Sequence, residues 1–266
     1  MRTFLLLSLG SLVLAVVAIA VWSFQMGRPE LMVLAAVPGA LALPVMIAYL
    51  LAAYLGVIQQ QRQGMLDVAK RWGFHYRAGH AKGLDADLAG FYLLDKSTHL
   101  LDEIRGERAG IPLHVLNIRN GNSAGEGSGY SFYTVACLPG QLTDCPDFLV
   151  LPHSILWPRE EPYVRVEGSL VRDTFSQHFT LRTAHREREQ TILDILDDSL
   201  VDWFLKRTSL GLQVSGGSLW AWQRSSVAWE LQRAFQSVRV KVAEDAESIA
   251  RQALEVLSAI KERIRE

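Results

Sequence analysis

Two long runs without a charged residue open this chain, and they constrain its fold more than any other feature. The first run covers residues 4–24 and the second residues 31–58, with the polar break Gln25–Glu30 between them. About 20 apolar residues in a helix cross a hydrocarbon core of roughly 30 Å. Each run must be helical, because an unpaired peptide group in lipid costs several kcal/mol. The sequence therefore predicts a transmembrane hairpin over residues 1–58, with spans at about 4–24 and 31–58, and a soluble domain over residues 59–266.

The details of the two runs refine this hairpin. As one helix the second run would measure roughly 42 Å, so it must tilt, kink or emerge from the lipid, and Pro38 and Pro44 favour a kink. Small residues four apart, such as Ala35 and Gly39, permit close contact between helices. The alternative is a cleaved signal peptide ending near Ala18-Ile19-Ala20. The hairpin is preferred because a second apolar run follows directly.

Basic residues predict the orientation of the hairpin. Arg2 precedes the first run, and the break holds only Arg28, which Glu30 offsets. Four basic residues follow the second run: Arg62, Lys70, Arg71 and Arg77. By the positive-inside rule, both ends of the hairpin face the cytoplasm. We expect an integral protein of a bacterial inner membrane, with the N-terminus and the C-terminal domain cytoplasmic.

The composition of the remainder fits a membrane-anchored globular protein. Beyond the hairpin the chain carries 25 basic and 27 acidic residues, and this near balance gives no electrostatic surface for nucleic acid. About 200 residues are enough for one sizeable core or two small ones. Cys137 and Cys145 form no disulfide framework and fit a reducing compartment. A single hairpin-closing disulfide in an oxidising compartment is the alternative.

After a helix that Gly73 caps, the pattern changes to strands. The clearest strand covers residues 130–138, which are rich in aromatic and β-branched side chains. The glycine-rich stretch 120–129 links it to a strand at 111–119 as a long hairpin loop. Further strands are predicted at residues 74–77, 148–152, 163–167, 175–181, 211–215 and 218–223. A helix is predicted at about 187–206, and a short helix running into a strand at 84–94. Hairpin connections of this kind predict an α+β domain, an antiparallel sheet packed with helices on one side.

The predicted hairpin around Gly216-Gly217 and the C-terminal helix supply the candidate interface residues. Trp220 and Trp222 share one face of their strand, and aromatic rings anchor both cores and partner interfaces. In the C-terminal helix, apolar residues are spaced alternately 4 and 3 apart: Ala246, Ala250, Ala253, Leu257, Ile260 and Ile264. This stripe either packs on the domain's own sheet, the preferred interpretation, or forms a coiled-coil seam with a second copy. The candidate interface residues are Trp220, Trp222, Leu257, Ile260 and Ile264.

Three catalytic or ligand-binding patterns fail in their context. Gly121-Asn122-Ser123-Ala124-Gly125 matches the nucleophile-elbow pattern, with Asp144 and His153 downstream, but an elbow requires a helix directly after the serine. The glycines at 125–129 lack a following helix N-terminus and a Gly-Lys-Ser or Gly-Lys-Thr sequence, so neither nucleotide fingerprint is met. The seven histidines show no zinc-ligand spacing. The sequence therefore assigns no catalytic, cofactor-binding or metal-binding residue.

Several segments together resemble a known group of proteins. They are the N-terminal hairpin, the helix end 69–76, the glycine loop leading into Tyr130–Ala136, and Pro146–Pro152. This arrangement resembles a group of uncharacterised bacterial membrane proteins that carry a cytoplasmic domain of unknown function. The resemblance implies no activity, because the group has no assigned catalytic residues.

The function expected from these observations is that of a non-enzymatic, membrane-anchored interaction or assembly protein. Its expected partners are the lipid bilayer and either itself or another membrane protein, with no cofactor and no nucleic acid. The alternative is a membrane-anchored enzyme of hydrolase type whose catalytic residues meet only in the fold. An enzyme should gather histidines and carboxylates, whereas a binding protein should expose an apolar or aromatic patch.

Overall fold

The computed structural model describes residues 55–79, 91, 98–121, 130–153, 163–166, 173–225 and 235–265. The chain divides into two compact units, residues 1–59 and residues 60–266. Within the described residues, no helix combines the length and apolar character needed to span a bilayer. The predicted spans at 4–24 and 31–58 lie outside the described residues, apart from residues 55–58.

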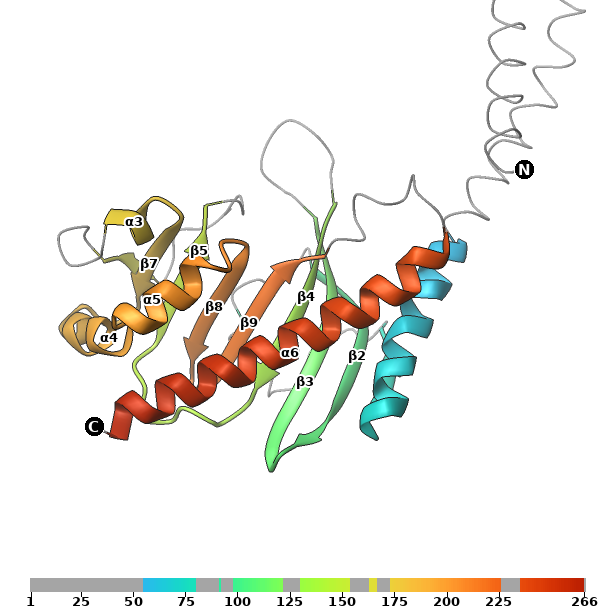
Figure 1. Ribbon diagram of the computed structural model, residues 1–266, viewed down its shortest axis with the longest axis horizontal. Helices are drawn as coiled ribbons and strands as arrows, with labels where there is room; N and C mark the ends of the chain where they lie inside the picture. Colours follow the sequence, from blue (N-terminus) through green and yellow to red (C-terminus); the bar gives the residue numbers. More distant parts are fainter. Residues whose placement is uncertain are drawn as a thin grey trace, which may run out of the picture. The chain divides into compact units, whose positions relative to one another are not determined.

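The described residues of the second unit form a nine-stranded sheet whose neighbouring strands all pair antiparallel (Figure 1). The strands are β1 (His75–Ala78), β2 (Thr98–Arg108), β3 (Ile111–Gly121), β4 (Tyr130–Leu138), β5 (Phe148–Pro152), β6 (Val164–Arg165), β7 (Phe179–Thr183), β8 (Leu210–Ser215) and β9 (Ser218–Arg224). Their order across the sheet is β1-β2-β3-β4-β9-β8-β5-β7-β6. This sheet and its helices confirm the predicted α+β class.

The helices of the second unit pack against one face of the sheet. The first is a helix of residues 55–72, of which residues 60–72 belong to this unit. The others are α3 (Asp173–Ser176), the 3₁₀ turn η2 (Arg186–Arg188), α4 (Glu189–Ile195), α5 (Asp198–Leu205) and α6 (Phe235–Arg265). Figure 1 shows α6 running diagonally across the central strands, with its C-terminal end beside α4 and α5. The apolar stripe of α6 is buried against the sheet through Ala246, Ala253 and Leu257. We call this side of the sheet the helix face.

The other side of the sheet, which we call the aromatic face, carries a second apolar cluster. Trp220 and Trp222 lie on it beside Val135 and Cys137, their partners across the β4–β9 pairing. Phe91 stacks on Trp220 at a centroid distance of 4.6 Å and meets Trp222 edge-on at 5.4 Å. Gly211 pairs with Trp222, and a Cβ at Gly211 would collide with the indole ring. The sheet therefore has buried apolar surface on both faces.

Most predicted strands lie where the sequence places them. The bounds of β4 and β5 coincide with the predictions, and the Gly216-Gly217 hairpin is present with φ of +55° and +75°, as a two-residue turn of type I′ requires. The predicted C-cap at Gly73 is confirmed by its φ of +68° and by the hydrogen bond from Phe74 N–H to Ala69 C=O at 2.8 Å. Cys137 and Cys145 are both buried and are not joined by a disulfide, so the structure does not contain the alternative disulfide.

Three elements differ from the predictions. Residues 175–181 are not one strand, because α3 ends at Ser176 and β7 begins only at Phe179. The helix predicted at 187–206 is broken, since Asp197 leaves the helical conformation and caps α5 by accepting the N–H of Leu200 at 2.8 Å. Strand β2 was not predicted, although it pairs with both β1 and β3. The helix and strand predicted at 84–94 lie outside the described residues, apart from Phe91.

Candidate functional site

Strand β2 carries two adjacent buried carboxylates, Asp102 and Glu103, which are 2% and 1% exposed. Because successive side chains of a strand point to opposite faces, Asp102 lies on the helix face and Glu103 on the aromatic face. A buried carboxylate is costly unless it is paired or hydrogen-bonded. The neighbouring strand β1 supplies a partner to each, Tyr76 to Asp102 and Arg77 to Glu103.

On the helix face, Asp102 joins three elements. The hydroxyl of Tyr76 donates to Oδ1 of Asp102 at 2.6 Å, and Nε of Arg62, on the helix of residues 55–72, lies 4.0 Å from the same oxygen. Burial raises the pKa of Asp102 to about 6, although Tyr76 and Arg62 act in the opposite direction. Burial and the bond to Asp102 also raise the pKa of Tyr76. The carboxyl of Asp102 is therefore the meeting point of this helix, β1 and β2.

On the aromatic face, Glu103 joins a histidine and an arginine. Its Oε1 lies 3.2 Å from Nδ1 of His114, and its Oε2 lies 3.7 Å from Nη1 of Arg77. Oε2 is buried and has no hydrogen-bond partner. Cys137, a buried cysteine, lies directly opposite His114 in the β3–β4 pairing. Carboxylate, imidazole and thiol side chains thus share one face of three adjacent strands.

The chemistry open to this group is limited by its burial. A histidine acts as a general base only where the reacting group can approach within about 3 Å, and His114 and Cys137 are both buried. Among the described residues, no group of three or more histidine, cysteine, aspartate or glutamate side chains is arranged to hold a metal ion. Glu103, His114 and Cys137 therefore have side chains of the types used in acid–base or thiol chemistry, but a substrate reaches them only if the domain opens.

A third polar region joins the helix of residues 55–72 to α6. Asp67 and Arg239 form an ion pair at 2.5 Å, and Arg71 and Glu247 form another at 2.7 Å. The hydrogen bond from Arg239 lowers the pKa of Asp67, against the effect of burial. About one turn before Asp67, Gly64 faces α6 so closely that a Cβ there would lie 2.6 Å from the backbone oxygen of Arg239. Residues 60–72 are therefore fixed to the domain by both packing and charge.

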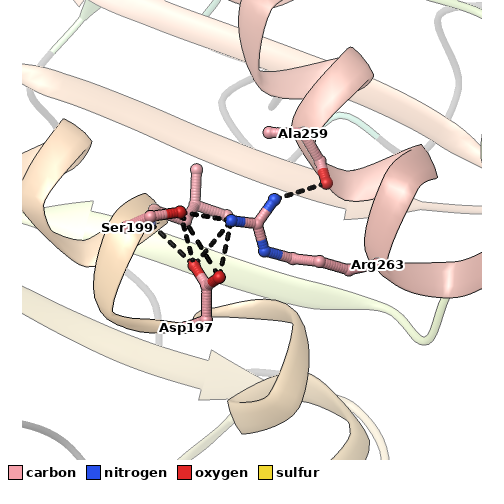
Figure 2. Close-up of polar contacts among 5 residues, drawn as sticks. Asp197, Ser199, Ala259 and Arg263 are labelled. Atoms are coloured by element: carbon pink, nitrogen blue, oxygen red, sulfur yellow. Dashed lines mark hydrogen bonds and ion pairs between the residues drawn. The ribbon is translucent and has the colours of Figure 1, made fainter. Parts of the chain in front are cut away.

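The C-terminal end of α6 is joined to the start of α5 by a cluster of polar contacts among Asp197, Ser199 and Arg263, shown in Figure 2. Arg263 reaches the N-cap of α5 and donates from Nη2 to both carboxylate oxygens of Asp197 at 2.7 Å, while its Nη1 donates to the C=O of Ala259. Ser199 also contacts Arg263 and donates to Asp197 at 3.0 Å. Burial opposes ionisation of Asp197, but the bonds from Arg263 and the Leu200 N–H prevail and lower its pKa. One carboxylate thus caps a helix and anchors the end of another.

Four of the five candidate interface residues lie inside the protein. Trp220 and Trp222 are buried in the aromatic face, and Leu257 and Ile260 are buried beneath α6. Only Ile264, which is 37% exposed, reaches the surface. A partner can therefore touch Ile264, but it reaches the other four only if the domain opens.

The elbow pattern is not assembled by the described residues. Ser123 lies outside them, and Asp144 and His153 are both exposed. His153 instead pairs through Nε2 with the hydroxyl of Thr180 at 3.1 Å. The structure therefore gives this pattern no support from its described members.

Sequence reasoning missed Asp102, Glu103 and His114. An Asp-Glu doublet is typical of an exposed segment, and no sequence signal marks these carboxylates as buried. The sequence feature that could have indicated strand β2 is the turn at Ala109-Gly110, where both residues have positive φ. It separates two stretches of equal length, β2 and β3, whose pairing places Glu103 diagonally opposite His114.

The fold and these clusters define an α+β protein with a nine-stranded antiparallel sheet, helices on one face and buried charge in the strands at one end. No family model matches the sequence, and no curated protein matches it. The solved structures include a similar chain, described as "crystal structure of the mycobacterial trehalose monomycolate transport factor A, TtfA". The TM-score is 0.46 and the identity 10%, over 77% of this chain and 96% of that chain. A likeness of this degree carries no argument about function.

Proposed function

We propose that this chain is a non-enzymatic interaction or assembly protein anchored in a membrane by the apolar hairpin of residues 4–24 and 31–58. The charge-free length of both runs supports the anchor. The lipid bilayer is then the first partner, and the sheet domain is the part that binds other proteins.

The observation that carries this proposal is the way residues 60–72, which directly follow the hairpin, are built into the domain. Met65 and Val68 are fully buried, Gly64 allows close approach to α6, and Arg62 reaches the buried Asp102. A flexible tether would need none of these contacts. We infer that residues 60–72 belong to the folded domain and are not a flexible linker between the anchor and the sheet.

The partner is either a second copy or another membrane protein. Small residues in the spans, such as Ala35 and Gly39, permit close helix contact within the bilayer. In the domain, Ile264 continues the buried stripe of α6 onto the surface. Both features favour lateral association of anchored chains.

The test of the anchor is a topology experiment. In the proposed topology, the domain and both ends of the hairpin lie in the cytoplasm of a bacterium. A cysteine at position 25 and a reporter after Glu266 should then lie on opposite sides of the membrane. A membrane-impermeant thiol reagent applied to intact cells should label Gln25→Cys and leave the C-terminal reporter untouched. A chain found in the supernatant after alkaline extraction, or with both sites labelled from outside, would contradict the anchor.

A second candidate function is favoured by one observation, the meeting of Glu103, His114 and Cys137 on adjacent strands. In an enzyme of hydrolase type these residues would supply an acid–base pair and a nucleophile. Any hydrolytic activity should then disappear in both His114→Gln and Cys137→Ala while the thermal midpoint stays near that of the wild type. Activity that survives both changes would remove this candidate.

A further inference from the structure

Two arginines lie directly opposite each other at the edge of the sheet far from β1. Arg165 of β6 and Arg182 of β7 are cross-strand partners in an antiparallel pairing, so their side chains leave the same face. Like charges in this position destabilise a sheet. Among the described residues, neither arginine forms an ion pair with a carboxylate. We propose that Arg165 and Arg182 form a binding site for a phosphate group.

The first support for this site is an unpaired group inside it. Nε of Arg182 is buried and has no hydrogen-bond partner. A buried N–H of a charged group is costly when it is unsatisfied. The position opposite Arg165 thus combines like-charge repulsion with an unsatisfied donor on Arg182. A bound oxyanion at the ends of the two guanidinium groups offsets the repulsion, whereas Nε of Arg182 itself is closed to solvent.

The second support is that a carboxylate on the same face next to β7, that of Asp147, is already engaged. Asp147 precedes Leu149 by two residues, and Leu149 is the partner of Arg182 in the β5–β7 pairing. Asp147 accepts the Ser215 hydroxyl at 3.3 Å and the Gly216 N–H at 3.1 Å. It therefore stabilises the β8–β9 turn and does not neutralise the arginine pair.

The surroundings suit an anion of moderate size. Leu149 and Tyr163 belong to the buried apolar cluster of this face, so the arginines stand at the border of a region from which water is excluded. Thr180 is the next residue of β7 on this face, and its hydroxyl pairs with Nε2 of His153, which directly follows β5. Arg165 is exposed and Arg182 is half-buried, so an anion can reach the pair from solvent and form charge-assisted bonds to both.

The chemistry of the pair favours phosphate. Each guanidinium presents a planar fork of donors that fits two oxygens of a phosphate group. Two forks facing each other can bind different oxygens of one phosphate, which a carboxylate with two oxygens cannot satisfy as well. A free ion and the headgroup of an anionic lipid both supply such a phosphate group, and the experiment separates these two sources.

The test uses the full-length protein in a neutral detergent and a phosphate-free buffer. Inorganic phosphate should raise the thermal midpoint and give saturable heat in calorimetry. Arg182→Gln and Arg165→Gln should each weaken this binding at least about tenfold. Arg182→Lys should weaken it too, because lysine keeps the charge but lacks the fork. Arg186→Gln, an exposed arginine of η2, is the matched control and should bind as the wild type does.

A second series replaces inorganic phosphate by phosphatidylglycerol added to the micelles, with phosphatidylcholine as its neutral counterpart. A shift with phosphatidylglycerol alone assigns the site to a lipid headgroup, and a shift with inorganic phosphate alone assigns it to a free ion. The proposal is overturned if neither ligand shifts the midpoint, or if the shift survives Arg182→Gln and Arg165→Gln. Neither outcome depends on the hairpin, so this site is tested separately from the proposed function.

Discussion

At the scale of single residues, the two adjacent carboxylates of β2 show where sequence reasoning stops. Asp102 and Glu103 resemble a solvated charge pair in the sequence, yet both are buried and each depends on a neighbour from another strand. Which partner meets which carboxylate follows from the strand register, and one residue of slip would exchange the faces. The bulge between Leu100 and Asp102 sets that register and has no reliable sequence signature.

Asp102 should make the stability of the domain depend on pH. Its pKa is raised from 3.8 to about 6, so the folded protein holds this proton more tightly than the unfolded chain does. The protonated carboxyl therefore stabilises the folded state below pH 3.8. This contribution to the free energy of unfolding is lost as the pH rises from 3.8 to about 6, and the total loss is roughly 3 kcal/mol. Asp102→Asn removes this loss and keeps an acceptor for Tyr76. At pH 7.5 the variant should therefore be at least as stable as the wild type.

The measurement is the free energy of unfolding of both proteins between pH 4 and pH 8. The difference between them should change across the interval from about pH 4 to about pH 6 and be flat above it. Asp144→Asn, which changes an exposed carboxylate, is the control and should follow the wild type within about 0.5 kcal/mol. A difference that is independent of pH would show that Asp102 does not titrate in this way.

At the scale of elements, the sequence predicts strands better than it predicts helix breaks. The aromatic and β-branched run of β4 and the Gly216-Gly217 turn specify their structures locally, and both predictions are confirmed. The apolar stripe across residues 187–206 continues through the break at Asp197, so periodicity alone joins α4 to α5. The break is stabilised by Arg263, 66 residues away, and a contact at that distance cannot be read from the local pattern.

Asp197→Ala should therefore cost more than the loss of a helix cap. Removing an N-cap aspartate typically costs about 1 kcal/mol. Here the change also leaves the guanidinium of Arg263 without its carboxylate, and that side chain is only 15% exposed. We expect a total loss of about 2 to 3 kcal/mol in the free energy of unfolding, measured by denaturant titration. Glu262→Ala, at an exposed carboxylate of α6, should change stability by less than about 0.5 kcal/mol.

The stripe of α6 gives a test that separates core from interface. Leu257 is fully buried in the domain, so Leu257→Asp should place an unpaired charge in the core and cost more than about 3 kcal/mol. The mass of the particle in detergent, measured by light scattering, should not change. Ile264→Asp, at the exposed end of the same stripe, should cost little stability. If Leu257→Asp lowers the mass and leaves the domain stability unchanged, the stripe is an interface between copies.

At the scale of the whole molecule, the second unit is a sheet with two buried faces that differ in chemistry. The helix face gathers the contacts of residues 60–72 and α6, whereas the aromatic face holds Phe91, Trp220 and Trp222 and ends at the arginine pair. Composition and periodicity predict the α+β class, because they report how much surface each element must bury. They do not predict the opposed arginines or the Gly64 crossing, which arise only when distant elements meet.

The crossing at Gly64 makes a sharp final prediction because two effects of Gly64→Ala oppose each other. Alanine in place of glycine stabilises an isolated helix by about 1 kcal/mol. The new Cβ would lie 2.6 Å from the backbone oxygen of Arg239 and 3.1 Å from Cβ of Val242, and a backbone atom inside a helix cannot yield as a flexible side chain can. The collision should prevail, and Gly64→Ala should lower the free energy of unfolding by about 1 to 3 kcal/mol in net terms. Lys70→Ala, at an exposed position of the same helix, is the control, and it should stay within about 0.5 kcal/mol of the wild type. A Gly64→Ala protein that is more stable than the wild type would show that this helix is not fixed against α6 and would remove the main support for counting residues 60–72 as part of the folded domain.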